Sequence, residues 1–443
     1  MRKLLCVIAA LCFLLCGCGK TADNSILDEP SVSQNDTPSV EEPSSSKKPE
    51  SGKDTPSSST LSAPSSSSCV SSKPDDTRPQ AGRTYYYYEN LNASQKKVYD
   101  AIDSAVLKME SGMLSLGKTS VRDISLAFAA VRADHPEYFW MPHSYINKIA
   151  GDQYYIAIEY EGEGNSVSYL CTKAERTSME AALKRTVAEI KKLIPANASD
   201  YEIELFLHDY ICQNVSYVDT GANDMRYTAY GALVEKQAIC EGYARAMQLL
   251  LNEFSIPSTL VCGYSLERGE SHMWNSVKIG GDWYNLDVTW DDDDQNRLTT
   301  HRYFNLTDSE LSKTHIADPD FSTLADGDFG GGTVPSYNFS LPKCTATKYH
   351  YPNKAGCILT ENTADSQSVV CAVMKAAADK KAAYCEFYLA KTPQNGTSAV
   401  ALAEKYALQN CKNVVNSKSK HKIAGLSVAL SGNTFIVFLN YGG

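Results

Sequence analysis

Three side chains in the middle of this 443-residue chain have the chemistry needed for acyl transfer: Cys240, His272 and Asp287. Nucleophilic acyl transfer requires an activated nucleophile, a base within hydrogen-bond reach of it, and a third group that orients the base. A thiol, an imidazole and a carboxylate can supply these roles in that order. Whether they act together depends on the secondary structure that carries them.

Cys240 is predicted to lie at the start of a helix. Residues 241–251 follow a helical pattern, which is expected to end before Pro257. At a helix N-terminus, unpaired backbone N–H groups and the helix dipole favour a thiolate. The small residues Gly242 and Ala244 would let another element pack closely there. A single cysteine is more often a buried, unreactive residue, so Cys240 becomes significant only through its partners.

His272 and Asp287 are predicted to lie on the two arms of one β-hairpin. Gly280 and Gly281 form a favoured two-residue turn between apolar arms. With the turn centred there, His272 pairs with Thr289 and Trp274 with Asp287, so the histidine and the aspartate are diagonal neighbours on one face. The other face is apolar and should point into a core. Its residues are Met273, Val277, Ile279, Tyr284, Leu286 and Val288.

This arrangement predicts a division of roles. Cys240 attacks a carboxamide carbonyl, His272 takes the thiol proton and returns one to the leaving amine, and Asp287 holds the imidazole in the useful tautomer. The oxyanion would lie against backbone N–H groups at the helix start, together with one side-chain donor. Three residues are candidates for that donor: Tyr230, Gln237 and Trp274.

Three sequence blocks carry a resemblance to a known family. They are CEGYA at 240–244, HMWN at 272–275 and WYNLDVTW at 283–290. Together they resemble the transglutaminase-like superfamily, and within it the bacterial secreted branch related to the kyphoscoliosis peptidase and cytokinesis proteins. The resemblance covers about 177–311. It implies a papain-like α+β core in which a helix bearing the cysteine packs on an antiparallel sheet bearing the histidine and the aspartate.

The resemblance leaves the reaction open, because the family includes cross-linking transglutaminases, peptidases, amidases and members without catalysis. No β-sandwich domain or calcium site of the cross-linking enzymes is recognisable, which favours water as the acyl acceptor. The acidic run 291–294 is expected to be a solvated loop. We expect no cofactor and no metal, and the spacing of Cys240, Cys262 and His272 does not match a known metal site. The alternative function is a non-catalytic binding or scaffold lipoprotein.

The elements around the site predict three folded regions. An N-terminal α+β extension at 84–176 should contain a helix capped by Asn92, a helix at 119–134, and strands near 144–149, 153–160 and 167–171. The catalytic domain at 177–320 should open with capping boxes at Thr177 and Ser199. A small C-terminal α/β accessory domain at 335–443 should contain helices near 366–381 and 398–411. We interpret His208 and Asp209 as surface or packing residues, because adjacent helix positions diverge.

The N-terminus predicts export and anchoring. Residues 1–17 have a basic start and a short apolar run typical of a signal peptide. Gly17 before Cys18 resembles a lipobox, so Cys18 is the expected lipidation site. Residues 18–83 are rich in Ser and Pro and should form a disordered tether. The protein is therefore expected outside the cytoplasm, on the outer face of a bacterial cell membrane.

Composition limits the partners. The formal net charge of −10 argues against nucleic acid, which leaves a protein or peptide substrate, including cell-wall peptide. The 14 cysteines show no CxxC spacing, so neither a disulfide framework nor a metal site is predicted. A disulfide among the five cysteines of the tail is compatible with export, but the sequence does not give its pairing.

Overall fold

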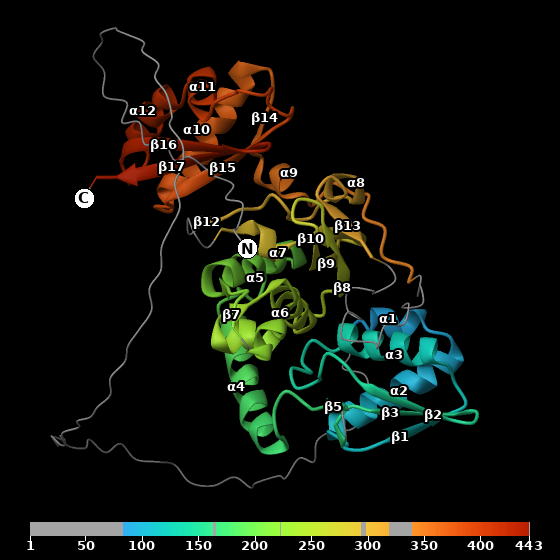
Figure 1. Ribbon diagram of the computed structural model, residues 1–443. Helices are drawn as coiled ribbons and strands as arrows, with labels where there is room; N and C mark the ends of the chain where they lie inside the picture. Colours follow the sequence, from blue (N-terminus) through green and yellow to red (C-terminus); the bar gives the residue numbers. More distant parts are fainter. Residues whose placement is uncertain (1–82, 163–164, 222, 294–297, 319–338, 443) are drawn as a thin grey trace, which may run out of the picture. The chain divides into compact units, whose positions relative to one another are not determined.

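The computed structural model describes residues 83–162, 165–221, 223–293, 298–318 and 339–442 (Figure 1). The predicted signal peptide, the lipidation site Cys18 and the tether as far as residue 82 lie outside the described residues, as do residues 319–338. Within the described ranges, no helix is both long enough and apolar enough to cross a membrane. The predicted α+β fold class is confirmed.

The N-terminal extension combines helices with a small antiparallel sheet. Asn92 and Gln95 form the predicted capping box of α2. The third predicted strand, at 167–171, is wrong beyond Val167, because β5 ends at that residue; β5 pairs with β4 in a separate hairpin. The helices are α1 (Tyr86–Asn90), α2 (Ala93–Lys108) and α3 (Val121–Asp134), and the strands are β1 (Leu114–Gly117), β2 (Ile146–Ala150), β3 (Gln153–Ala157), β4 (Tyr160–Gly162) and β5 (Asn165–Val167).

Two helices precede the cysteine segment, and one begins earlier than predicted. Helix α4 (Lys173–Lys192) is capped by Thr172, whose hydroxyl accepts from the Glu175 backbone N–H, so the capping box predicted at Thr177 is wrong. Thr177 lies inside the helix, so the start of the catalytic domain predicted at residue 177 also falls within α4. Helix α5 (Asp200–Asn214) has the predicted capping box of Ser199 and Glu202.

The centre of the fold is a helix against an antiparallel sheet. The strand order is β10-β9-β8-β13. The predicted hairpin register is confirmed as far as Leu286, which pairs with Asn275. There the strand ends, so Thr289 lies in the short helix α7 and not opposite His272 as predicted. The elements are α6 (Cys240–Asn252), β8 (Ser258–Ser265), β9 (Glu270–Ile279), β10 (Asp282–Leu286), α7 (Val288–Asp291) and β13 (His315–Ala317).

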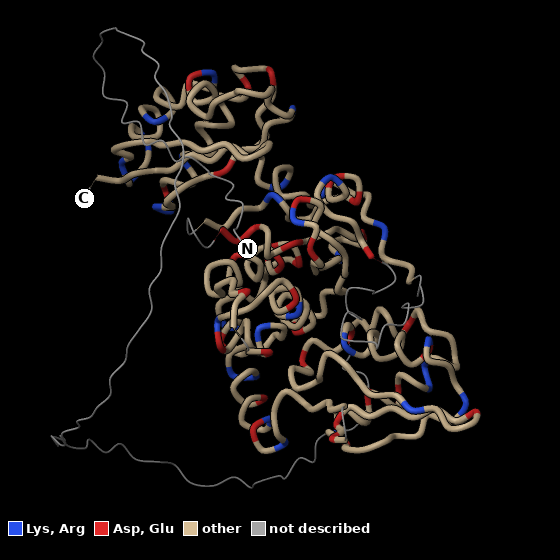
Figure 2. The backbone as a smooth tube through the Cα atoms, in the orientation of Figure 1, with Lys and Arg blue, Asp and Glu red and all other residues tan. Residues whose placement is uncertain are grey.

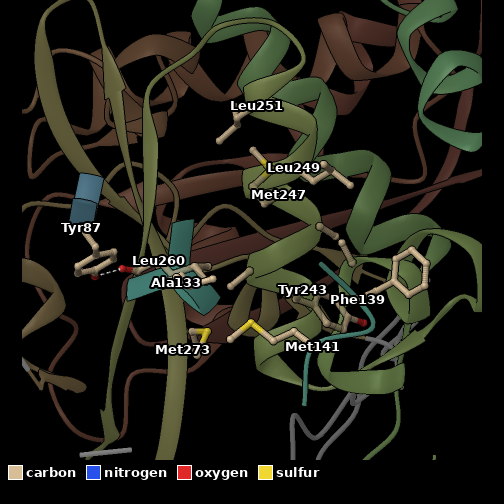
Figure 3. Close-up of a cluster of buried hydrophobic side chains, with 14 of the residues drawn as sticks. Tyr87, Ala133, Phe139, Met141, Tyr243, Met247, Leu249, Leu251, Leu260 and Met273 are labelled. Carbon is tan, nitrogen blue, oxygen red and sulfur yellow. Dashed lines mark hydrogen bonds between the residues drawn. The ribbon is translucent and has the colours of Figure 1, made fainter. Parts of the chain in front are cut away.

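One large hydrophobic cluster fixes helix α6 to this sheet and to the extension (Figure 3). Met247 and Leu251 of α6 and Met273 of β9 are buried in it, and the Tyr87 hydroxyl of α1 donates to the Leu260 carbonyl of β8. Each such side chain contributes roughly 1.5–3 kcal/mol through burial. The extension and the helix that carries Cys240 therefore share one hydrophobic core, which fixes the position of that helix.

The C-terminal region forms its own mixed sheet, ordered β14-β15-β17-β16, with a separate hydrophobic cluster. The single helix predicted at 398–411 is wrong, because the chain turns through a left-handed conformation at Ala407 and forms two helices. The elements are α9 (Tyr351–Ala355), β14 (Ile358–Leu359), α10 (Thr363–Asp379), β15 (Tyr384–Leu389), α11 (Ala399–Lys405), α12 (Leu408–Lys418), β16 (Ile423–Ser431) and β17 (Thr434–Tyr441).

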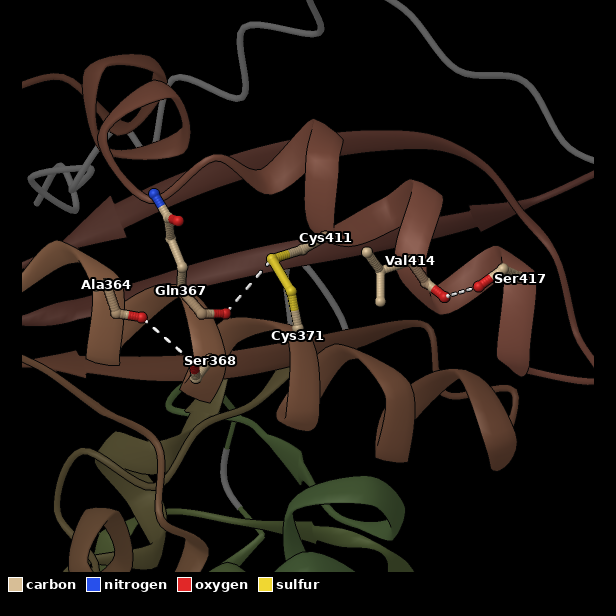
Figure 4. The surroundings of a disulfide bond; sticks show 7 residues. All are labelled: Ala364, Gln367, Ser368, Cys371, Cys411, Val414 and Ser417. Atoms are coloured by element: carbon tan, nitrogen blue, oxygen red, sulfur yellow. Dashed lines mark hydrogen bonds between the residues drawn. A yellow bond between two sulfur atoms is a disulfide. The ribbon is translucent and has the colours of Figure 1, made fainter.

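A disulfide joins two helices of this region. Cys371 on α10 bonds to Cys411 on α12, and the two residues are 40 positions apart in the sequence (Figure 4). The pairing that the sequence left open is therefore between these two of the five tail cysteines. The other three, Cys344, Cys357 and Cys385, are buried free thiols.

Candidate active site

Cys240 is the first residue of α6, as predicted. The N-cap residue, Ile239, offers no side-chain acceptor, so no side chain caps the N–H groups of the first turn. Gly242 lies so close to the preceding segment that an added Cβ would be 2.3 Å from the Arg226 carbonyl oxygen. The small residue predicted to allow close packing is thus required for it. The half-buried thiol and a set of uncapped backbone donors lie at the same end of the helix.

His272 and Asp287 are in direct contact. His272 Nε2 lies 2.7 Å from Asp287 Oδ2, and both side chains are buried. Asp287 leaves β10 to become the N-cap of α7, where its Oδ1 accepts from the backbone N–H groups of Thr289 and Trp290. One carboxylate oxygen is therefore held by the backbone while the other faces the imidazole. Since Asp287 occupies Nε2, the Nδ1 atom of His272 is left for the thiol.

Electrostatics favour a charged imidazole at this position. Burial alone would lower the pKa of His272, but the Asp287 carboxylate and a hydrogen bond with Cys240 outweigh it and raise that pKa from 6.5 to about 10. Burial would raise the pKa of Asp287, yet the neighbouring histidines hold it well below its usual value. The Cys240 thiol also contributes to the raised pKa of His272, so it lies close to the imidazole whose Nε2 contacts Asp287.

A second histidine, which is not among the predicted site residues, contacts the same carboxylate. His315 on β13 is fully buried, and its Nε2 lies 3.0 Å from Asp287 Oδ2. Its Nδ1 is 2.8 Å from the Thr314 hydroxyl, which can donate to it. His315 is thus oriented to donate an N–H to Asp287. Pairing of the edge strand β13 with β8 brings it there, and no local motif marks that pairing.

A network of buried charges fixes the start of α6 to the extension. Glu241 Oε1 accepts from Arg132 Nη2 of α3 and from Arg245 Nε, each at 2.8 Å. On the other side, Asn275 of β9 donates its amide N–H to the Ala244 carbonyl at 3.0 Å. The position of Cys240 relative to the sheet is therefore set from both flanks.

The three predicted oxyanion donors lie in different environments. The Trp274 indole N–H points to Asn285 Oδ1 at 3.4 Å, and its ring stacks beside His272 with centroids 6.1 Å apart. Tyr230 packs against the Phe139 ring, and Gln237 has an exposed side chain on the short strand β7 (Gln237–Ala238). The geometry thus assigns the Trp274 N–H to Asn285.

A tyrosine not considered from the sequence lies near the nucleophile. Tyr217, on strand β6 (Ser216–Tyr217), pairs in parallel with Ala238, two residues before Cys240. Burial raises the pKa of the Tyr217 hydroxyl, and the charge on Cys240 raises it further. Its phenol is therefore within electrostatic range of the sulfur. A parallel two-residue pairing is too short to leave a periodic signal in the sequence.

In the papain-like α+β class, a helix that begins with cysteine packs against an antiparallel sheet that carries histidine and aspartate. The arrangement of α6, β9 and the end of β10 is of this class. Within the chain, residues 189–288 match the family described as the transglutaminase-like superfamily. This part of the chain is a transglutaminase-like domain, and the resemblance given by the three sequence blocks is confirmed at that level.

Three solved structures are similar to this chain over a limited part of its length. A candidate cysteine protease from Cytophaga hutchinsonii is 24% identical, with 27% of this chain and 40% of that chain covered and a TM-score of 0.22. A structure described as a TGase is 15% identical, with 41% and 51% covered and a TM-score of 0.23. The periplasmic domain of TgpA from Pseudomonas aeruginosa, bound to ethylmercury, is 15% identical, with 33% and 58% covered and a TM-score of 0.21.

The chain spans 40% to 58% of the length of these three structures. No curated protein matches the chain.

Proposed function

We propose that the protein is a cysteine-dependent acyl-transfer enzyme that acts on peptide or side-chain amide bonds through Cys240, His272 and Asp287. The observation that carries this proposal is the buried contact between His272 and Asp287, with the Cys240 thiol close to the same imidazole at the start of α6. A thiol that only fills space needs neither a buried imidazole partner nor a carboxylate behind it.

The reaction follows from these positions. With its pKa at about 10, His272 already holds the thiol proton on Nδ1 at neutral pH, so the Cys240 thiolate attacks the amide carbon and forms a C–S bond as the carbonyl π bond opens. The negative oxygen is stabilised by backbone N–H groups of the first turn of α6, with Tyr217 or Gln237 as the side-chain donor. His272 then protonates the amine nitrogen as the C–N bond breaks, which leaves a thioester. Asp287 stabilises the imidazolium throughout.

Water is the proposed acceptor in the second half of the cycle. His272 takes a proton from water as its oxygen attacks the thioester carbon, the C–S bond breaks, and the proton returns to the thiolate. The net change is an amide plus water to an acid plus an amine. If a primary amine attacks in place of water, the same residues perform cross-linking.

We further propose that the enzyme works outside the cytoplasm, held to the outer face of the membrane by a lipid on Cys18. Its substrate would then be an exposed protein or a cell-wall peptide. The lipobox-like Gly17-Cys18 and the polar segment after it support this placement. Mass spectrometry of the mature N-terminus tests it, because an unmodified thiol on Cys18 contradicts anchoring.

The test of activity distinguishes hydrolysis, transfer to an amine and the absence of catalysis in one experiment. The protein is incubated with peptide and wall-fragment libraries, with and without a labelled primary amine. We expect new acids without label incorporation, and loss of turnover in Cys240→Ala and His272→Ala while circular dichroism stays unchanged. The matched control is Cys171→Ala, which removes another half-buried thiol. Activity that survives Cys240→Ala contradicts the proposal, and an inert wild-type protein supports a scaffold.

Thiol reactivity gives a test that needs no substrate. Cys171 and Cys240 are both half-buried, but only Cys240 has a histidine partner, whereas burial and the charge of Glu175 raise the pKa of Cys171. Iodoacetamide at neutral pH should therefore modify Cys240 faster than Cys171, as read by peptide mapping. Equal or slower labelling of Cys240 would refute an activated thiol.

A further inference from the structure

A second group of chemistry-bearing side chains lies away from Cys240. His208 and Asp209 are on α5, and His301 follows strand β12 (Leu298–Thr299). Asp209 Oδ1 lies 2.9 Å from His208 Nδ1 and 2.9 Å from His301 Nε2. The prediction that His208 and Asp209 cannot cooperate is wrong, because the Nδ1 atom of an imidazole lies near its own backbone and a neighbouring carboxylate can reach it.

Each imidazole of this group is held from behind by a buried carboxylate. His208 Nε2 lies 3.3 Å from Asp291 Oδ2, and His301 Nδ1 lies 2.7 Å from Glu386 Oε2 on β15. The side chains of Asp291 and Glu386 are 0% and 3% exposed. A metal-bound histidine characteristically donates its other ring N–H to a carboxylate, which fixes the tautomer and the ring orientation. Here both rings have that support.

The outer carboxylates are themselves positioned. Asp291 accepts the Tyr303 backbone N–H at 3.1 Å and the Thr300 hydroxyl at 2.9 Å. The prediction that the acidic run 291–294 forms a solvated loop is therefore wrong at Asp291, which is fully buried. Figure 2 shows acidic positions gathered around α7. Because these hydrogen bonds hold the buried Asp291 carboxylate in place, it is oriented toward His208.

The charge of this group calls for a cation. Three carboxylates, Asp209, Asp291 and Glu386, surround two imidazoles, and within the described residues their ion pairs are made to those imidazoles alone. The second oxygen of Glu386, Oε1, is buried without a hydrogen-bond partner among the described residues. When both imidazoles are neutral, as metal binding requires, the three carboxylates have no positive partner in this group, and a divalent cation supplies that charge.

We propose that His208 Nδ1, His301 Nε2 and Asp209 Oδ1 bind a divalent first-row transition-metal ion, with Zn²⁺ the best match. These atoms lie within 4.8 Å of one another, and the two contacts of 2.9 Å are near the ligand–ligand edge of about 3.3 Å that tetrahedral Zn²⁺ requires at ligand distances of about 2.0 Å. Two histidines and one carboxylate are a known zinc ligand set.

The surroundings leave room for the ion to enter. The Asp209 side chain is 35% exposed, so the carboxylate side of the site meets solvent and a water can complete the coordination. The opposite side is closed by the Tyr351 ring, which stacks on His301 with centroids 3.8 Å apart. Because the ligands come from α5 and from the segment after β12, with Glu386 on β15 behind, a bound ion would cross-link these segments and stabilise the folded state.

A similar trio, His272, Asp287 and His315, does not have this support. The remaining nitrogen of His315 faces a threonine hydroxyl, and that of His272 is left for the thiol. Among the described residues, neither imidazole has a hydrogen bond to a second carboxylate behind it. The two trios therefore differ in the atoms that an ion would contact. An ion at His272, Asp287 and His315 would also contact the Cys240 sulfur, whereas an ion at His208, Asp209 and His301 would contact only nitrogen and oxygen.

The test measures Zn²⁺ binding by titration against a competing chelator, with metal content checked by mass spectrometry. We expect one Zn²⁺ in the wild type that is lost in His301→Gln and Asp209→Asn. Glu386→Gln should bind about 10–100-fold more weakly, as expected for an orienting partner. The matched control is His135→Gln, because His135 also lies between two carboxylates, Asp103 and Glu137, but has no second imidazole. That variant should bind as the wild type does.

Cobalt provides a readout that does not depend on any variant folding. Co²⁺ bound to the wild type at nitrogen and oxygen ligands should give visible d–d absorption without a thiolate charge-transfer band, whereas Co²⁺ at Cys240 would show that band. A thiolate band, Zn²⁺ binding that persists in both His301→Gln and Asp209→Asn, or a wild type that binds no Zn²⁺ overturns the proposal. Zn²⁺ should also raise the melting temperature of the wild type and of His135→Gln but not of Asp209→Asn.

Discussion

Replacing Asp287 with asparagine separates the two tasks of this carboxylate. Its Oδ1 accepts two backbone N–H groups at the start of α7, and its Oδ2 faces Nε2 of both His272 and His315. Asparagine keeps an acceptor oxygen for the cap but presents an NH₂ group to the two imidazoles. Asp287→Asn should therefore preserve α7 while it removes the charge that stabilises the His272 imidazolium.

The size of the effect follows from the pKa of His272. With Asp287 present that pKa is about 10, and without the carboxylate burial should bring it to the usual 6.5 or below. At about 1.4 kcal/mol per pKa unit, the imidazolium loses roughly 5 kcal/mol of stabilisation. A raised pKa contributes stability that is complete below pH 6.5 and is lost as the pH rises through 10. The wild type should lose stability over that window, and Asp287→Asn should not.

The assay is an NMR titration of ring-labelled histidine, combined with urea unfolding at about pH 6 and about pH 9. We expect His272 to titrate below 7 in Asp287→Asn, and kcat to fall by about 10²–10⁴-fold because the imidazole takes the wrong tautomer. Asp287→Ala is the control, since it also removes the cap and should cost about 1 kcal/mol more. If His272 still titrates near 10 in Asp287→Asn, the carboxylate is not the cause of the raised pKa.

Three further outcomes are expected. His315→Leu removes one imidazole donor from Asp287, so the free energy of unfolding by urea should fall by about 1.5–3 kcal/mol and kcat should fall more than KM rises; unchanged kinetics would limit His315 to a packing role. Thr172→Ala removes the observed helix cap and should cost about 1 kcal/mol in thermal unfolding, whereas Thr177→Ala should cost almost nothing, and the reverse order would contradict the structure. Opening the disulfide by changing Cys371 and Cys411 to serine frees a 40-residue loop, which should cost about 4 kcal/mol as read by hydrogen exchange in β15 and β17; unaltered exchange would contradict this.

The hairpin could be predicted because its determinants are local. Gly280 and Gly281 both adopt positive φ, which the tight turn requires, and alternation of apolar residues on each arm permits one register only. The start of α6 at Cys240 was likewise accessible, since the helical pattern begins there. The end of β10 could not be predicted from local patterns. The Asp287 backbone N–H donates to the Tyr303 carbonyl, and the Asp287 side chain caps α7, so the chain leaves the strand at this residue.

The start of α4 shows where a local rule is degenerate. The sequence contains two consecutive capping boxes, Thr172 with Glu175 and Thr177 with Glu180, and either one satisfies the local requirement. The helix begins at the first. Arg176, in the turn that the first box adds, lies over the Trp140 ring at 3.5 Å and donates to the Leu107 carbonyl. Tertiary contacts with the extension therefore decide between the two boxes.

The positions of His315 and Asp291 could not be predicted for a related reason. A charged or polar residue becomes buried only when its partners arrive, and here the partners come from distant segments: His315 reaches Asp287 through β13, and Asp291 meets His208 of α5. In the sequence, Asp291 is one of four consecutive acids, and consecutive like charges normally repel one another into solvent. Three donors from other segments, the His208 Nε2–H, the Thr300 hydroxyl and the Tyr303 backbone N–H, reverse that preference. Residues whose burial depends on such non-local compensation are therefore the ones that local patterns misplace, and both the support of Asp287 and the proposed metal site belong to this group.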